Sequence, residues 1–324
     1  MTNKELYRIF CEEHQADLPI YSQYWWMEVV CAGKQWDVII VRNKAHKIVA
    51  TLPYLIGHKW RFSYILMPPL TQTNGPHLLY PDGQTQRERL TYEKDLCYDL
   101  INQIGHLDID YYQQNFEPQL TNWLPFCWKH YQQTTRYTYR IDDTSNLESV
   151  FAQFTPAKQR QIRKGIRNGL ECQQNALSAE DFYKFHCQIL TLKGEKDSTP
   201  QVVETGICRE AIKREQGVLL SINAPGSPDI QSALLMVWDG QTAYYLIPAN
   251  HPGYKETGAS SLIIWRAIQL AHRKSLRFDF EGSMQESIEN SYNQFGTTQV
   301  PYMQITKASS FIAKLWEMSK IMFR

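Results

Sequence analysis

The spacing of apolar and polar positions divides the chain into short helices and strands along its whole length. Apolar side chains three and four residues apart predict helices over residues 4–14, 22–30, 86–104, 147–154, 156–167, 178–192, 200–215, 260–273 and 309–324. Runs rich in β-branched and aromatic residues predict strands over residues 36–41, 47–56, 60–67, 107–112, 134–141, 170–174, 218–222, 230–238, 242–247, 276–280 and 300–305. This mixture predicts an α/β protein with mixed sheets.

The order of these elements repeats. In each half, two helices precede a meander of three strands, and one more helix and strand follow. The chain has 324 residues, more than one hydrophobic core usually fills. Its most polar short linker runs from Asp142 to Asn146. We therefore predict two related domains, 1–142 and 143–324, with the first a degenerate copy of the second.

The start of the helix near Ser260 has the composition of a phosphate site. The strand over 242–247 stops at Pro248, and the loop after it ends in small residues. Small residues at a helix start leave backbone N–H groups exposed where the helix dipole is positive. The alternative is ordinary loop punctuation with a serine N-cap. The candidate binding residues are Lys255, Gly258, Ala259, Ser260 and Ser261.

Two carboxylates end the strand over 276–280. Asp279 and Glu281 are two residues apart, so a strand points them to one face. A carboxylate placed there can take a proton from an attacking amine. The alternative is an edge strand with a solvated face.

A basic stripe follows Pro156. Four cations recur at helical spacing, and no acidic residue lies between Thr155 and Leu170. Such a stripe attracts the phosphates of a coenzyme, a tRNA or a lipid head group, and its alternative is a solvated surface. The four residues are Arg160, Arg163, Lys164 and Arg167.

The C-terminal half resembles Fem-type proteins, which are tandem members of the GNAT acyltransferase superfamily. Their signature is an Asp-Phe-Gly-like strand end followed by a Phe-Gly pair that a basic residue precedes. The matching segments are Arg277-Phe278-Asp279-Phe280-Glu281-Gly282-Ser283, Tyr292-Asn293-Gln294-Phe295-Gly296 and the strand Val300-Pro301-Tyr302-Met303-Gln304-Ile305. The sequence departs from the signature at the basic position, where Tyr292 and Asn293 stand. Lys255-x-x-Gly258-x-Ser260 is similar to the pyrophosphate loop of GNAT proteins.

The resemblance implies two tandem GNAT-like domains and transfer of an acyl or aminoacyl group to an amine by direct attack. Glu281 and Asp279 are candidate bases, and Tyr292 is a candidate acid for the leaving group. The donor is an acyl-CoA thioester or a charged tRNA. The acceptor is an amine of a small molecule or of the cell envelope. The competing hypothesis is a GNAT-shaped binding protein, without catalysis, for a phosphorylated or lipid-like partner.

Composition narrows these hypotheses only slightly. A net charge of +1 and a hydrophobic content of 43% are those of an ordinary globular protein, not of one whose whole surface binds nucleic acid. The seven cysteines contain no Cys-x-x-Cys pair, so we expect neither zinc nor a disulfide framework. The N-terminus lacks an apolar signal segment, and we expect a cytoplasmic protein. The C-terminal helix, if not packed on its own domain, is a candidate for contact with a membrane surface.

Overall fold

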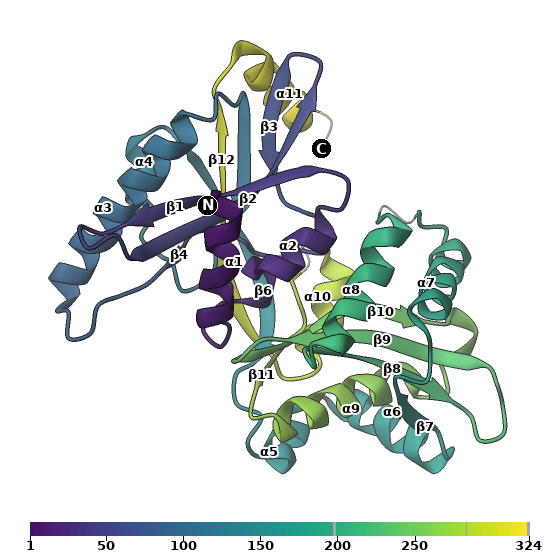
Figure 1. The fold of residues 1–324 in the computed structure, drawn as a ribbon. Coiled ribbons are helices and arrows are strands. Elements are labelled where there is room, and N and C mark those ends of the chain that lie inside the picture. The colour runs from purple at the N-terminus through teal and green to yellow at the C-terminus, as the bar shows by residue number, and fades with distance from the viewer. Residues whose placement is uncertain (197–198, 283, 323–324) are drawn as a thin grey trace. The chain divides into compact units, whose positions relative to one another are not determined.

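The computed structural model describes residues 1–196, 199–282 and 284–322, and it describes side chains as far as residue 317. The chain divides into two compact units (Figure 1). The first unit combines Met1–Arg136 with Pro301–Arg324, and the second is Tyr137–Val300. Within the described part of the chain, no helix combines the length and the apolar content that crossing a bilayer requires.

The first unit consists of one sheet and of helices from both of its sequence segments, 1–136 and 301–324. Its sheet has the strand order β1-β2-β3-β5-β12, and β4 pairs with β2. β1, β2 and β3 are antiparallel neighbours, β5 runs parallel to β3, and β12 is antiparallel to β5. The elements are α1 (Asn3–Glu13), η1 (Ile20–Ser22), α2 (Tyr24–Val30), β1 (Gln35–Arg42), β2 (Ile48–Lys59), β3 (Phe62–Leu66), β4 (His77–Leu78), α3 (Gln86–Gly105), β5 (Tyr111–Asn115), α4 (Leu124–Trp128), β12 (Thr298–Ala308) and α11 (Phe311–Met322).

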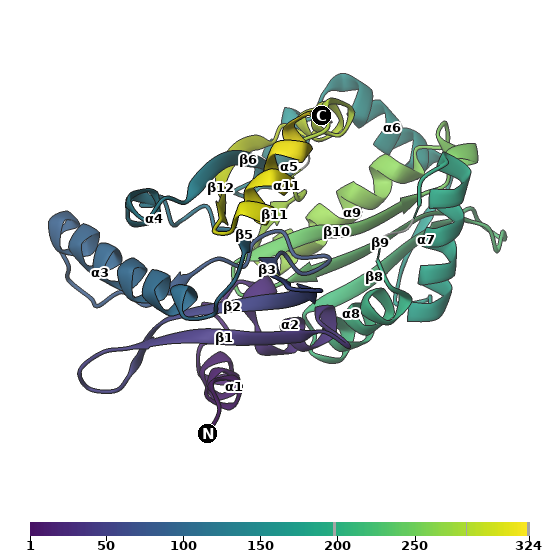
Figure 2. The ribbon, with the colours of Figure 1, turned by 90° about the horizontal axis from the view of Figure 1, so that it is seen from above.

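The second unit is a sheet covered by helices on both faces. Its strand order is β6-β11-β10-β9-β8-β7. α7 and α8 lie on one face of the β8, β9 and β10 strands, and α9 lies on the other (Figures 1 and 2). The elements are β6 (Gln132–Ile141), α5 (Leu147–Gln153), α6 (Pro156–Arg167), β7 (Glu171–Gln174), α7 (Ala179–Lys193), α8 (Gln201–Lys213), β8 (Gly217–Asn223), β9 (Ile230–Trp238), β10 (Thr242–Asn250), η2 (Pro252–Tyr254), α9 (Ala259–Arg273), β11 (Arg277–Asp279) and α10 (Glu286–Asn293).

The two units share one topology, which confirms the predicted α/β repeat. In the first unit α1 and α2 precede the antiparallel strands β1 to β3, and α3 leads to β5, parallel to β3. In the second unit α7 and α8 precede the antiparallel strands β8 to β10, and α9 leads to β11, parallel to β10. α3 and α9 are therefore equivalent helices.

The division of the chain differs from the linker at 142–146. β6 and β12 both cross the division, and residues 301–324 belong to the first unit, where β12 pairs with β5. Thr144 is buried in that linker, its hydroxyl donates to the carbonyl of Leu276 at 2.6 Å, and its carbonyl lies 2.7 Å from His272 Nδ1. The polar segment 142–146 is thus a connection that hydrogen-bonds to the second unit and does not separate two domains.

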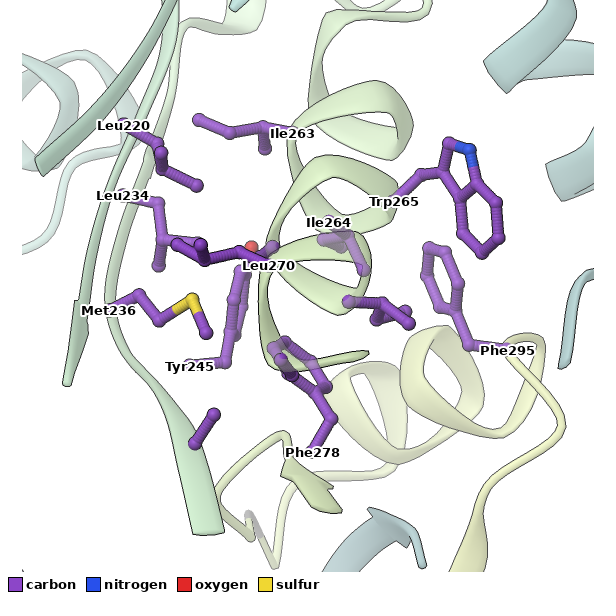
Figure 3. Close-up of a cluster of buried hydrophobic side chains, with 14 of the residues drawn as sticks. Leu220, Leu234, Met236, Tyr245, Ile263, Ile264, Trp265, Leu270, Phe278 and Phe295 are labelled. Atoms are coloured by element: carbon purple, nitrogen blue, oxygen red, sulfur yellow. The ribbon is translucent and has the colours of Figure 1, made fainter. Parts of the chain in front are cut away.

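α9 is the central helix of the second unit's core. Leu262, Ile263, Ala267 and Ile268 are fully buried. In Figure 3, Leu220, Leu234 and Met236 of the sheet lie on one side of α9, and Trp265 points to the opposite side. Because a helix covered on nearly all sides cannot shift, its first turn has a fixed place in the unit.

Candidate active site

β10 and β11 pair over only three residues. The parallel register runs from Thr242 opposite Arg277 to Tyr244 opposite Asp279, where β11 ends. β10 continues to Asn250 along β9, with an irregularity between Tyr245 and Ile247. In open α/β sheets, ligands bind at the carboxyl ends of parallel strands. This edge of the second unit is therefore the expected position of a ligand-binding site.

Gly258 sets the position of the α9 N-terminus. Its φ is +91°, in the left-handed region that favours glycine. A Cβ on Gly258 would overlap the carbonyl oxygen of Gln161 and lie 2.8 Å from the amide nitrogen of Gly165. A Cβ on Gly165 would in turn lie 3.3 Å from the Gly258 carbonyl oxygen. The loop before α9 therefore touches the backbone of α6, and this contact requires a glycine at position 258.

The first turn of α9 suits an anion. Its N-cap is Gly258, which supplies no side-chain cap, and no acidic residue lies in the turn. The serine N-cap of the alternative interpretation is not found, because Ser260 and Ser261 lie inside the helix and Ser261 is buried with Ala259. The Thr257 hydroxyl accepts a hydrogen bond from the Ala259 amide at 3.4 Å. Helix N–H groups without such a partner lie at the positive end of the helix dipole and attract phosphate.

The equivalent helix of the first unit, α3, starts with a side-chain cap and an acidic residue. The Thr85 hydroxyl accepts a hydrogen bond from the Glu88 amide, and the Glu88 carboxylate accepts one from the Thr85 amide. This capping box satisfies the N–H groups and places a negative charge where a phosphate would sit. Of the two equivalent helices, α9 is the one whose N-cap residue makes no side-chain cap and whose first turn has no acidic residue.

The basic stripe lies on α6, beside the α9 N-terminus. Arg160, Arg163 and Arg167 are exposed, and Lys164 is half-buried, 3.9 Å from the Glu256 carboxylate of the neighbouring loop. The Arg163 guanidinium lies over the Phe151 ring at 5.3 Å. Lys255 is exposed in the same loop. The helix that carries the stripe thus lies against the loop before α9, through the backbones of Gln161, Gly165 and Gly258.

Asp279 is enclosed by partners. Its carboxylate is fully buried, accepts a hydrogen bond from Arg140 Nε at 2.7 Å, and accepts another from the Thr138 hydroxyl. It also accepts the backbone N–H of Glu281 at 2.8 Å. A fully buried carboxylate with this many donors has its acceptors satisfied and is closed to a substrate. We therefore correct its predicted role from base to positioning residue, and Glu281 remains the candidate base.

Glu281 stands at a constrained point of the backbone. Its φ is +54°, which is uncommon for a residue with a side chain, and its side chain is partly exposed. The next residue, Gly282, packs on β6 so closely that a Cβ would overlap the Tyr137 carbonyl oxygen. Such backbone constraints persist where surrounding structure determines them, often at functional sites.

Tyr292 reaches the same strand end from α10. Its ring centroid is 5.0 Å from that of Phe280 and 6.3 Å from that of Tyr245. Burial, followed by the nearby Tyr245, Glu281 and Asp279, raises the pKa of Tyr292 far above its ordinary value. The phenol therefore keeps its proton at neutral pH and can donate a hydrogen bond.

The predicted residues thus fall into two groups. Glu281, Asp279 and Tyr292 meet where β11 ends, and the α9 N-terminus lies against the backbone of α6, the helix that carries the four cations. Both groups belong to the carboxyl end of the β10 and β11 pair. Their convergence on one ligand remains a prediction.

Sequence reasoning missed three kinds of residue. Arg140 and Thr138 contact Asp279 from β6, 139 and 141 residues away along the chain, and the polar sequence of β6 carries no local signal of this partner. Gly165 lies between two isoleucines of a helix, which signals a close approach of another backbone. Lys158 lies 5.0 Å over the Phe295 ring, and burial lowers its pKa.

Solved structures with the same fold cover nearly the whole chain. FemX has a TM-score of 0.69 at 10% identity, over 94% of this chain and 96% of that chain. L-PGS from Bacillus licheniformis has a TM-score of 0.56 at 10% identity, over 99% and 97%. A tandem GNAT protein from the clavulanic acid biosynthesis pathway has a TM-score of 0.52 at 11% identity, over 95% and 94%.

This chain has a Fem-like tandem GNAT fold. No protein-family model matches its sequence, and no curated protein matches it. At these identities the likeness concerns the fold alone, so the function must be argued from the site.

Replacing Gly258 by alanine tests the contact between α9 and α6. A left-handed residue other than glycine costs about 1–2 kcal/mol, and overpacking against the α6 backbone adds about 1–3 kcal/mol. We expect Gly258→Ala to lower the free energy of unfolding, measured by denaturant titration, by the sum of these costs, about 2–5 kcal/mol. Gly226→Ala is the matched control, because Gly226 has φ +71° and open space around its Cβ position. Equal losses in the two variants would contradict the close contact.

Replacing Asp279 by asparagine tests the buried pair. Arg140 would keep a nearly buried charge without its partner, which typically costs about 3–5 kcal/mol. We expect Asp279→Asn to lower the free energy of unfolding by that amount, measured in denaturant. Asp142→Asn, the same change at an exposed position, should cost less than about 0.5 kcal/mol. A stable Asp279→Asn protein would show that the pair does not hold β11 in place.

Proposed function

We propose that the protein is an N-acyltransferase of the GNAT superfamily that transfers an acyl or aminoacyl group to an amine. One observation carries this proposal: an uncapped helix start beside a basic helix, in the same unit as Glu281 and a protonated Tyr292. A phosphate-bearing donor and an amine acceptor need these two sets of groups.

The proposed step is direct attack. The amine nitrogen forms a bond to the donor carbonyl carbon, and the carbon–sulfur or carbon–oxygen bond to the leaving group breaks. Glu281 takes the proton that the amine loses, and Tyr292 gives its proton to the departing sulfur or oxygen. Asp279 holds the Glu281 backbone in position through its amide.

The donor in this proposal is an acyl-CoA thioester or an aminoacyl-tRNA, the two that the resemblance implies. Both bring phosphates, which the α9 N-terminus and the cations of α6 would bind. The acceptor is an amine of a small molecule or of the cell envelope, and the C-terminal helix is the element that would contact a membrane. A GNAT-shaped binding protein is the competing function, and it predicts ligand binding without turnover.

Thermal shift with acetyl-CoA, a long-chain acyl-CoA and total tRNA tests the donor. A ligand at a hundred times its dissociation constant stabilises the native state by about 2.7 kcal/mol, a shift of several degrees. We expect at least one of the three to produce such a shift. The absence of a shift with all three would contradict the proposed donor class.

Replacing the four stripe cations by glutamine tests where the phosphates bind. Each neutralised phosphate contact contributes a little under one unit to the slope of log affinity against log salt concentration, so the slope should fall by roughly 3. Binding by titration at several salt concentrations measures it. The matched control removes four exposed cations from α7 and α8 of the same unit, and it should retain the parent slope. The control residues are Lys184, Lys193, Arg209 and Lys213.

Replacing Glu281 by glutamine tests the base. The change removes proton acceptance and keeps the shape, so turnover should fall by about two to four orders of magnitude with little change in stability. Single-turnover kinetics with the donor found above measure this. Glu286→Gln, the same change at an exposed position five residues on, should leave turnover intact. Full activity of Glu281→Gln would assign proton removal to water.

A further inference from the structure

Trp60 occupies an unusual place in the first unit. Lys59 pairs with Phe62 in the register of β2 and β3, so Trp60 and Arg61 form a two-residue hairpin turn. The φ of Trp60 is +62°, a position that glycine or asparagine normally fills. Its side chain is 98% exposed. A bulky residue thus adopts a costly backbone conformation and gains no packing in return.

Cations flank this tryptophan. Lys59 and Arg61, its chain neighbours, are both exposed. Within the described residues neither forms an ion pair with a carboxylate. The hairpin tip therefore presents an indole between two unneutralised positive charges.

α11 packs beside the hairpin and adds an apolar face. The Trp316 ring centroid lies 6.3 Å from that of Phe62 and 4.9 Å from that of Tyr111. Ala313 is fully buried, which fixes the side of the helix that faces the unit. Figure 1 shows α11 at the same end of the first unit as β3.

The other side of α11 is exposed and apolar. Phe311 is 74% exposed, Ile312 63% and Leu315 50%. The exposed charge among them is Lys314, and the nearby acid, Glu317, is half-buried and interacts with Tyr111. We call the exposed residues of the hairpin tip and of this helix face the hairpin–helix surface: Lys59, Trp60, Arg61, Phe311, Ile312, Lys314 and Leu315.

We infer that the hairpin–helix surface docks on an anionic lipid membrane. Tryptophan is favoured at the boundary between water and lipid, and an amphipathic helix lies there with its apolar side down. Three exposed cations on the same surface match the negative charge of anionic lipid head groups, each worth about 1 kcal/mol near such a surface. An indole that projects from a turn is also better placed to insert into the head-group region of a bilayer than to pack against a flat protein surface.

This inference is independent of the proposed transfer reaction. It concerns the first unit, whereas the candidate active site lies in the second. Membrane docking can therefore be tested without donor or acceptor. Its failure would remove the membrane contact proposed for the C-terminal helix and leave the proposed transfer reaction untouched.

Sedimentation of the full chain with lipid vesicles tests the proposal. We expect stronger binding to vesicles of phosphatidylcholine and phosphatidylglycerol in equal amounts than to vesicles of phosphatidylcholine alone, and weaker binding as salt rises. Lys59→Gln with Arg61→Gln should lower the partition coefficient on the mixed vesicles about fivefold per charge. Trp60→Ser should lower it on both kinds of vesicle.

The control is Trp128→Ser, the same change at another exposed tryptophan of the first unit, which is 52% exposed. It should bind vesicles like the parent. Trp60→Ser removes an exposed side chain, so its thermal unfolding should match or exceed that of the parent. Parent protein that stays in the supernatant with mixed vesicles would overturn the proposal. So would variants that bind like the parent, or a Trp60→Ser protein that changes its oligomeric state without losing lipid binding.

Discussion

The candidate site depends on a buried ion pair between two strands of the second unit. Asp279 ends β11, Arg140 lies on the neighbouring strand β6, and the two strands pair through Asp279 opposite Arg140. A buried pair repays the loss of hydration only when its geometry is good and its remaining acceptors are satisfied. Here the Thr138 hydroxyl and the Glu281 amide supply the other hydrogen bonds. The same carboxylate thus fixes the sheet register and the backbone of the candidate base.

A second constraint comes from space rather than charge. Gly258 and Gly165 let the loop before α9 approach the backbone of α6, and Gly282 lets the chain after β11 approach β6. Close backbone packing removes the freedom that surface loops usually have. Groups arranged this way need little reordering when a charged ligand arrives, which favours both binding and electrostatic catalysis.

Local pattern predicted most of the elements but not their long-range contacts. The helices over 86–104 and 260–273 were predicted within a few residues, because their apolar spacing and flanking turns are local signals. The partners of Asp279 were not predicted, since a strand carries no mark of the register in which a distant strand pairs with it. For the same reason the polar linker at 142–146 does not indicate the division, because β12 returns residues 301–324 to the first unit. Whether Asp279 or Glu281 is enclosed by partners also depends on such distant contacts.

The repeat gives an internal comparison that bears on function. α3 and α9 follow the same three-stranded meander and lead to the same parallel strand, so shared topology cannot explain why their first turns differ. Thr85 and Glu88 cap the start of α3 with their own side chains. α9 starts at a glycine and has no acid in its first turn, and in the loop before it Glu256 lies 3.9 Å from Lys164 of α6. A threonine N-cap is more stable than a glycine N-cap by about a few tenths of a kcal/mol, so the glycine at the start of α9 gives up a small amount of stability. Such a loss of stability at one of two equivalent helix starts is expected for a binding site. A backbone N–H group that already donates a hydrogen bond to a capping side chain is not available to a ligand.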